Sequence, residues 1–381
     1  MRAPVIRLSR KAVSAVERGH PWVFQEPGTR AEVGAVVELH GERGRVGWGL
    51  ADEGSIAVRV LGRGEPEALS RLLIRRIAAA DQARVQLLGA NTDAYRVVNA
   101  SGDGLPGMVI DRYGPLAVLR LYARAWEPHL AELVAAISSL GWVEMVFRRF
   151  GVERVDGGKS GGEALFGPVP PETSVVVENG VRFLVRPHVG QKTGLFLDQR
   201  EHRALVGRWA AGREVANLFG YTGGFSIYAA LGGASRVITV DIAADAVEDA
   251  RENFRLNGVN PDAHGFEVAD AFEWVPRGKL GFLIVDPPSL AHDKSSESAA
   301  RRAYEKLHRR LGPLVARGGL IGSSSCTSRL GVDLWRRAVG DGLQGTGDWA
   351  WHWVSVEPPD HPTALVHEQG RYLKFGLLRR I

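Results

Sequence analysis

Two side chains in this sequence have types and positions suited to chemistry on a ring. Cys326, the only cysteine among 381 residues, directly follows the strand-like run "GGLIGSSS". Asp286 follows the apolar run "LIV" and enters a turn that Pro287 and Pro288 stiffen. A free cysteine is most often a small buried apolar residue, and an aspartate before prolines often only ends a strand. Both residues follow predicted strands of one sheet, so we expect them at the same edge.

A thiol and a carboxyl group at one edge suit methylation of a pyrimidine at carbon. C5 of cytosine is too weak a nucleophile to attack a sulfonium methyl group. Addition of a thiolate at C6 converts the ring to an enamine whose C5 can attack. Protonation of N3, or a hydrogen bond to it, would ease this addition, and we assign that role to Asp286. Methylation of an amino group or a ring nitrogen needs no such nucleophile.

A nucleotide-binding pattern precedes these residues. "VANLFGYTGGFSIYAALGG" reads as a strand, a turn with Gly220, Gly223 and Gly224, and a helix. The next strand ends at Asp241, which can accept hydrogen bonds from ribose hydroxyls, and a third at Asp270, which can bond an adenine amino group. Each carboxylate alone is equally well a helix cap. The turn matches neither G-x-G-x-x-G nor G-x-x-x-x-G-K-[ST], which favours S-adenosylmethionine over dinucleotides and triphosphates.

The elements that must position these residues alternate between strand and helix from residue 187 to 381. The strand-like runs are "EVANLFG", "RVITVDI", "GFEVAD", "LGFLIVD" and "GLIGSSS", with helical stretches between the first four and before the last. This alternation predicts an α/β fold with a mostly parallel, doubly wound, Rossmann-like sheet. Ligands are then expected at the carboxyl ends of the strands.

Two smaller units precede this sheet. Residues 1–72 are β-rich, with strands predicted near 33–39, 45–50 and 56–61, after an amphipathic helix that ends at Gly19 and Pro21. Residues 73–186 read as a small α/β domain. It contains a helical stretch from 65 to 88 that crosses the boundary, three strands in "YRVVNASGDGLPGMVIDRYGPLAVLRLY", a helix in "EPHLAELVAAISSLG" and a loop in "GGKSGGEALFGPVPPE".

Composition allows an RNA partner without requiring one. The net charge is +5, and "KSSESAARRAYEKLHRR", from residue 294 to 310, is predicted to form a basic helix. Its basic side chains either contact phosphates or form a solvated face, and they are Arg301, Arg302, Lys306, Arg309 and Arg310. Tyr304 or Phe225 could stack on a flipped base. One cysteine, no secretory signal and no apolar run of about 20 residues predict a cytoplasmic protein, and the scattered histidines predict no metal site.

Several motifs, taken in order, resemble the RlmI-like ribosomal RNA 5-methylcytosine methyltransferases, which carry an N-terminal PUA domain. The motifs are "RGHPWVF", "GDGLPGMVIDRYG", "GQKTGLFLDQR", "NLFGYTGGFSIYAALGGA", "VDI", "LNG", "VDPPS", "SSSCTS" and "DHPTALVHEQGRYLKF". The resemblance implies a PUA-like RNA-binding domain at 1–72, an RNA-cleft domain at 73–186 and the methyltransferase domain at 187–381. It makes Cys326 the nucleophile and 23S ribosomal RNA the partner. It also implies contacts to the cofactor from Lys192, Thr193, Asn217, Gly220, Thr222, Gly223, Asp241, Ile242, Asp270, Ala271 and Asp286.

One departure keeps alternatives open. RlmI-type members usually carry lysine after Asp-Pro-Pro, whereas this chain has Ser289, as do relatives that methylate guanine. The alternatives are a guanine N-methyltransferase with a structural Cys326, a non-catalytic RNA-binding or ribosome-assembly factor, and a small-molecule methyltransferase. The sequence does not choose between naked RNA and an assembled particle as substrate, or between a monomer and a homodimer.

Overall fold

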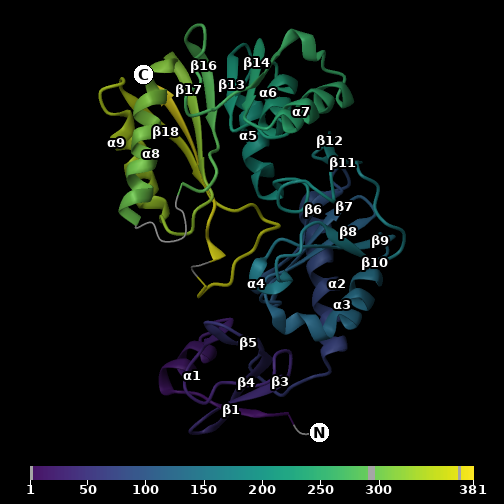
Figure 1. The fold of residues 1–381 in the computed structure, drawn as a ribbon. Coiled ribbons are helices and arrows are strands. Elements are labelled where there is room, and N and C mark those ends of the chain that lie inside the picture. The colour runs from purple at the N-terminus through teal and green to yellow at the C-terminus, as the bar shows by residue number, and fades with distance from the viewer. Residues whose placement is uncertain (1–2, 291–296, 368–369) are drawn as a thin grey trace. The chain divides into compact units, whose positions relative to one another are not determined.

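The strands after residue 213 form one sheet, shown with its helices in Figure 1. The computed structural model describes residues 3–290, 297–367 and 370–381. The strand order is β15-β14-β13-β16-β17-β19-β18, in which β15 to β17 pair in parallel and β19 runs antiparallel to both of its neighbours. Their bounds are β13 Glu214–Leu218, β14 Arg236–Asp241, β15 Gly265–Val268, β16 Leu280–Val285, β17 Val315–Ser325, β18 Trp349–Ser355 and β19 Lys374–Arg380. The predicted fold class and all five predicted strands are confirmed.

Helices cover both faces of this sheet because its central strands are apolar on both sides. Ala216 and Leu218 of β13 face α8 and α9, and they share a core with Tyr304 and Trp335 of those helices. Figure 1 shows α8 and α9 side by side on that face. The helix bounds are α5 Arg200–Trp209, α6 Gly224–Leu231, α7 Ala244–Leu256, α8 Glu297–Leu311 and α9 Val332–Leu343. The basic helix predicted in 294–310 is therefore present as α8, and residues 294–296 lie outside the described residues.

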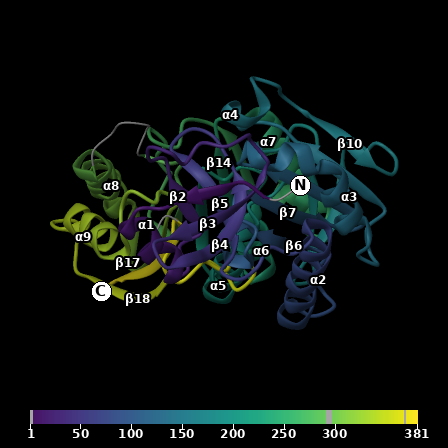
Figure 2. The ribbon, with the colours of Figure 1, turned by 90° about the horizontal axis from the view of Figure 1, so that it is seen from below.

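The N-terminal strands form a separate sheet with the order β1-β3-β4-β5-β2, and Figure 2 shows it with α1 alongside. The bounds are β1 Val5–Arg7, α1 Arg10–Glu17, β2 Trp22–Phe24, β3 Val36–Gly41, β4 Gly44–Ala51 and β5 Ile56–Gly62. Val16 of α1 packs into the core of this sheet with Val37 and Val58. The predicted helix and the three longer strands are confirmed. Strands β1 and β2 were not predicted, because three residues carry too little alternation to read.

The following sheet has the order β10-β9-β8-β7-β6. The bounds are α2 Leu69–Leu88, β6 Ala94–Asn99, β7 Met108–Tyr113, β8 Leu116–Leu121, α3 Leu130–Ser138, β9 Met145–Arg149, α4 Glu153–Asp156 and β10 Gly162–Phe166. The loop predicted over 157–172 is wrong in part, since β10 pairs antiparallel with β9. Glycine on both sides of "EALF" suggested a loop, but an edge strand needs only one partner. Two further strands are β11 Ser174–Glu178 and β12 Val181–Val185.

Two compact units divide the chain, and neither is a single stretch of sequence. The first contains residues 1–180, 185–197 and 359–370, and the second contains 181–184, 198–358 and 371–381. The three domains with boundaries at 72/73 and 186/187 stay a prediction. Within the described residues, every helix is too short or too polar to span a bilayer.

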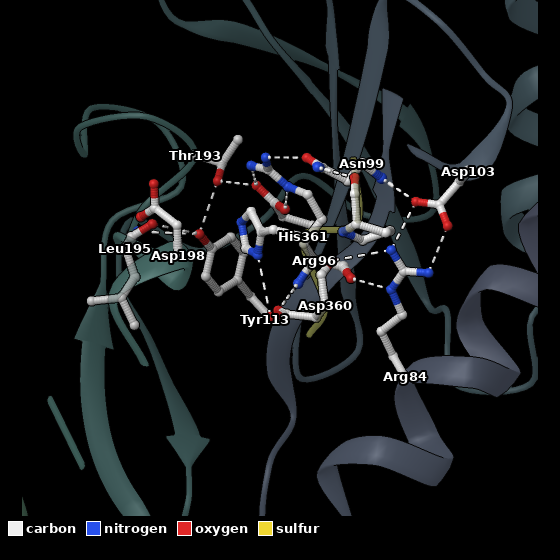
Figure 3. A network of polar contacts seen from close by, with 12 residues as sticks. Arg84, Arg96, Asn99, Asp103, Tyr113, Thr193, Leu195, Asp198, Asp360 and His361 are labelled. Atoms are coloured by element: carbon white, nitrogen blue, oxygen red, sulfur yellow. Dashed lines mark hydrogen bonds and ion pairs between the residues drawn. The ribbon is translucent and has the colours of Figure 1, made fainter. Parts of the chain in front are cut away.

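Hydrogen bonds fasten the two later segments of the first unit onto its strands and helices (Figure 3). The carbonyl of Asp360 accepts a hydrogen bond from Arg84 at 3.0 Å, and its carboxylate accepts one from the backbone N–H of Arg96 at 3.1 Å. The guanidinium of Arg84 also binds both carboxylate oxygens of Asp103 at 2.7 Å. The side chain of Asn99 donates to the carbonyl of Pro362 at 2.9 Å. Residues 359–370 thus belong to the fold of the first unit.

Candidate active site

The turn after β13 has an unfavourable backbone conformation that its surroundings must hold in place. Phe219 and Tyr221 adopt φ values of 60° and 47°, and Gly223 adopts 75°. A Cβ atom on Gly220 would lie 2.7 Å from Cγ2 of Thr239. Left-handed conformations at residues other than glycine are costly and concentrate at ligand sites. The turn therefore has the close-packed, strained backbone expected of a ligand-binding loop.

Asp241 and Asn253 hold this turn in place. The carboxylate of Asp241 accepts hydrogen bonds from the backbone N–H groups of Tyr221 at 2.8 Å and Ala243 at 2.9 Å. The side chain of Asn253, on α7, donates to the carbonyl of Thr222 at 2.7 Å. A carboxylate can accept about four hydrogen bonds, so Asp241 keeps capacity for two ribose hydroxyls.

Asn217, at the end region of β13, presents a buried acceptor. Its side chain is 1% exposed, and its Nδ2 donates to the hydroxyl of Ser226 at 3.0 Å. Its Oδ1 has no hydrogen-bond partner among the residues that the structure describes. A buried polar atom without a partner costs about 1–3 kcal/mol. An ammonium group of a ligand would satisfy this acceptor, which fits the amino-acid end of S-adenosylmethionine.

Apolar side chains flank the ends of β14 and β15. Ile242 is 74% exposed and Phe272 is 38% exposed, and the rings of Phe219 and Phe272 pack edge to face with centroids 4.9 Å apart. Asp270 is exposed and accepts a hydrogen bond from the N–H of Phe272 at 2.8 Å, while Ala271 is buried. Exposed apolar side chains beside a carboxylate suit an adenine ring. The sequence reasoning missed both phenylalanines, although "VADAF" contains one of them.

Gln199 connects the ends of β16 and β17. Its Nε2 donates to both carboxylate oxygens of Asp286, at 3.1 and 3.0 Å, and to the hydroxyl of Ser324 at 2.9 Å. Its Oε1 accepts a hydrogen bond from Nδ1 of His202 at 2.5 Å, so the imidazole carries its proton on Nδ1. Burial lowers the pKa of His202 to about 3, which keeps this ring neutral. The amide of Gln199 therefore fixes the Asp286 carboxylate beside the strand that leads to Cys326.

Cys326 directly follows β17 at the edge where β16 delivers Asp286. Burial raises the pKa of the Tyr304 phenol, and the nearby Cys326 and Asp286 raise it further. The three side chains thus lie close enough to interact electrostatically, and Cys326 is partly exposed. Tyr304 and Phe225 are 0% and 6% exposed, so neither offers a free ring face for stacking on a flipped base.

Lys192 and Thr193 belong to the first unit. The hydroxyl of Thr193 donates to Asp111 at 2.6 Å and lies 2.9 Å from the hydroxyl of Tyr113. The carbonyl of Lys192 accepts a hydrogen bond from Arg120 at 3.2 Å, and its φ is 54°. Within its own unit, the side chain of Thr193 helps to fasten the segment 185–197. A role of both residues at the cofactor stays a prediction.

The predicted RNA-binding residues of α8 differ in their surroundings. Arg301, Arg302, Lys306 and Arg309 are exposed. Arg301 pairs with Asp341 at 3.1 Å, and Arg309 pairs with Glu305 at 2.5 Å. Exposed pairs of this kind contribute little to stability, and an RNA contact of these residues stays a prediction. Arg310 is partly buried and donates to the carbonyl of Trp274 at 3.1 Å, so its guanidinium already serves the fold.

Comparison with known proteins agrees with this geometry. A family model described as S-adenosylmethionine-dependent methyltransferase matches residues 132–339, and one described as a PUA-like domain matches 6–63. The chain is 36% identical to a ribosomal RNA large subunit methyltransferase of Deinococcus radiodurans, over 98% of this chain and 97% of that one. It is 32% identical to ribosomal RNA large subunit methyltransferase I of Tolumonas auensis, over 99% of each chain.

A solved structure shares the fold over the whole length. It is a candidate methyltransferase complexed with SAH, with a TM-score of 0.86, 24% identity and coverage of 99% of this chain and 100% of that one. The fold and the strand-end site define a class I methyltransferase that uses S-adenosylmethionine. The chain belongs to the S-adenosylmethionine-dependent methyltransferases of the RlmI type, with a PUA-like domain at its N-terminus.

Proposed function

We propose that this enzyme methylates C5 of a cytosine in the ribosomal RNA of the large subunit, with Cys326 as the nucleophile and Asp286 at N3 of the ring. The names of the relatives support ribosomal RNA as the substrate, and the PUA-like domain supports RNA binding. The target atom is inferred from the shared edge where β16 and β17 present a carboxylate and a thiol. Gln199 bonds there to Asp286 and to Ser324, two residues before the thiol.

Three side chains of this protein have separate roles in the proposed reaction. The thiolate of Cys326 adds to C6, while the carboxylic acid form of Asp286 donates a hydrogen bond or its proton to N3 and takes that proton back when the adduct breaks down. The bound S-adenosylmethionine supplies an electrophilic methyl group to C5. Loss of the C5 proton to a base then restores the C5–C6 double bond as the C6–S bond breaks, which regenerates the thiolate. Gln199 keeps Asp286 oriented throughout, because both oxygens of that carboxylate contact its amide.

The test is nucleoside mass spectrometry on 23S RNA from a strain that lacks this gene. The RNA is incubated with S-adenosylmethionine and wild-type protein, Cys326→Ala, Asp286→Asn or the control Ser328→Ala, whose side chain is exposed two residues after the thiol. We expect 5-methylcytidine with wild type and the control, at least about 100-fold less with Asp286→Asn, and none with Cys326→Ala. RNA containing 5-fluorocytidine should trap the C6–S bond, since fluorine cannot leave as the proton does.

Methylation of guanine is the second candidate, and Ser289 is the residue that favours it. In that case wild type and Cys326→Ala would both form the same methylguanosine, and no protein would be trapped on fluorinated RNA. Absence of any methyl transfer, together with failure to bind SAH in calorimetry, would favour the non-catalytic RNA-binding role.

A further inference from the structure

A buried lysine lies beside the strand end that carries the thiol. Lys374 is the first residue of β19 and pairs in register with Ser325, the residue before Cys326. Its side chain is 2% exposed. The ammonium donates to the carbonyl of Thr327 and, at 3.0 Å, to that of Tyr372. A lysine is rarely buried to this extent without a charged partner, because desolvating the ammonium is costly.

Two ionisable groups of the described residues, Glu357 and Cys326, interact with this ammonium. Burial lowers the pKa of Lys374 to about 8, while Glu357 and Cys326 both raise it. The Oε1 atom of Glu357 accepts the backbone N–H groups of Tyr372 and Leu373, at 2.5 and 2.9 Å. Two of the three ammonium N–H groups go to backbone carbonyls, one of them that of Thr327, the residue directly after Cys326.

We propose that Lys374 is a positioning residue that holds Cys326 as the thiolate, ready to add to the pyrimidine ring. This inference rests on the nucleophilic role proposed above for that cysteine. The thiol proton leaves to solvent, and Lys374 keeps its own proton throughout. A neighbouring cation lowers the pKa of a thiol, since the charged form gains an attractive partner. Tyr304 and Asp286, which also lie near the thiol, supply no positive charge.

The pH range over which Lys374 can stabilise the thiolate follows from the pKa of its own ammonium. A pKa of about 8 means that the ammonium is present at and below neutral pH and is lost as the pH rises above 8. The thiolate is therefore favoured near pH 7, where free cysteine with a pKa of about 8.5 is mostly protonated.

Alkylation of Cys326, the only cysteine in the sequence, tests whether Lys374 stabilises the thiolate, and it needs neither RNA nor cofactor. The rate of iodoacetamide modification of the full chain is measured from pH 5 to 10 by intact mass spectrometry. The variants are Lys374→Met, Lys374→Arg and the control Lys11→Met, whose side chain is exposed on α1. We expect Lys374→Met to move the midpoint up by about one pH unit or more, so that the rate at pH 7 falls roughly tenfold. Lys374→Arg and the control should stay close to wild type.

Three results would overturn the inference. One is an unchanged midpoint in Lys374→Met, even if methyl transfer is lost, because that pattern would give the lysine a different role. Another is an equal shift in Lys374→Arg, which would point to packing alone. The third needs no variant: a wild-type midpoint at or above about 8.5 leaves no thiolate stabilisation to explain. Failure to form 5-methylcytidine with a low wild-type midpoint would instead count against the proposed function.

Discussion

Replacing Gln199 with glutamate would turn the contact that orients Asp286 into a repulsion. The amide nitrogen lies 3.1 and 3.0 Å from the two carboxylate oxygens, and glutamate would place an oxygen there instead. Two unit charges 3 Å apart at an effective dielectric constant of 20 repel by about 5 kcal/mol. Because Asp286 is partly exposed, we expect about half of this, ~2–3 kcal/mol, in the free energy of unfolding.

The loss of stability should depend on pH. The carboxyl pair shares a proton in the folded variant, so its folded-state pKa lies above the unfolded value of about 4.3. The variant therefore keeps its full stability below the unfolded-state pKa. It loses stability as the pH rises through the folded-state pKa. Gln199→Glu should therefore be about 1 kcal/mol less stable than wild type at pH 5 and ~2–3 kcal/mol less stable at pH 8.

Urea unfolding at pH 5, 6.5 and 8 measures this difference. Gln199→Met, of similar size and without charge, is the control: its loss of hydrogen bonds should cost a similar amount at each pH. The reasoning is refuted if Gln199→Glu matches wild type at pH 8, or if its deficit follows that of Gln199→Met at all three values.

Three further predictions concern the cofactor turn and the packing behind the site. Asp241→Ala should weaken SAH binding about 100-fold in calorimetry through lost hydrogen bonds to the carboxylate, whereas the exposed Asp245→Ala should not; equal affinities would contradict the site. Gly342→Ala should destabilise the fold by ~2 kcal/mol, because its Cβ would lie 2.5 Å from a carbonyl of α8, while Gly340→Ala, with nothing within 4 Å, should be neutral or stabilising by thermal unfolding. Burial lowers the pKa of His308 to about 4. Between pH 7 and 5 the unfolded chain therefore takes up a proton that the folded chain does not, at a cost of ~2 kcal/mol of stability. His308→Gln should remove that part of the pH dependence in urea unfolding, and an unchanged dependence would contradict this role of His308.

The catalytic-domain sheet could be predicted because local signals there agree with the fold. Its strands are short apolar runs between helices, and Asp241 and Asp286 stand at the ends of two of them. In β10 the signals conflict, since flanking glycines outweigh the short strand itself, and pairing with β9 decides the outcome. The order and direction of β19 depend on pairing across the sheet, which periodicity does not report.

Gln199 and Lys374 could not be predicted near the thiol, and the physical reason is the same for both. Gln199 contacts side chains 87 and 125 positions away, and Lys374 bonds a carbonyl 47 positions away. No spacing rule links residues so far apart. Buried polar groups with distant partners are set by tertiary packing, so only coordinates reveal them.

The first unit is completed late in synthesis. Arg84 and Arg96 emerge from the ribosome early, but Asp360, which binds both, follows more than 260 residues later. At about 5–20 residues per second, this delay is roughly 13 to 55 seconds. During that time the guanidinium of Arg84 can bind Asp103, but the carbonyl of Asp360 that also accepts its hydrogen bond is not yet made. A nascent chain that stops before residue 359 should therefore leave its N-terminal part open to chaperones and proteases, whether or not the strands have already paired.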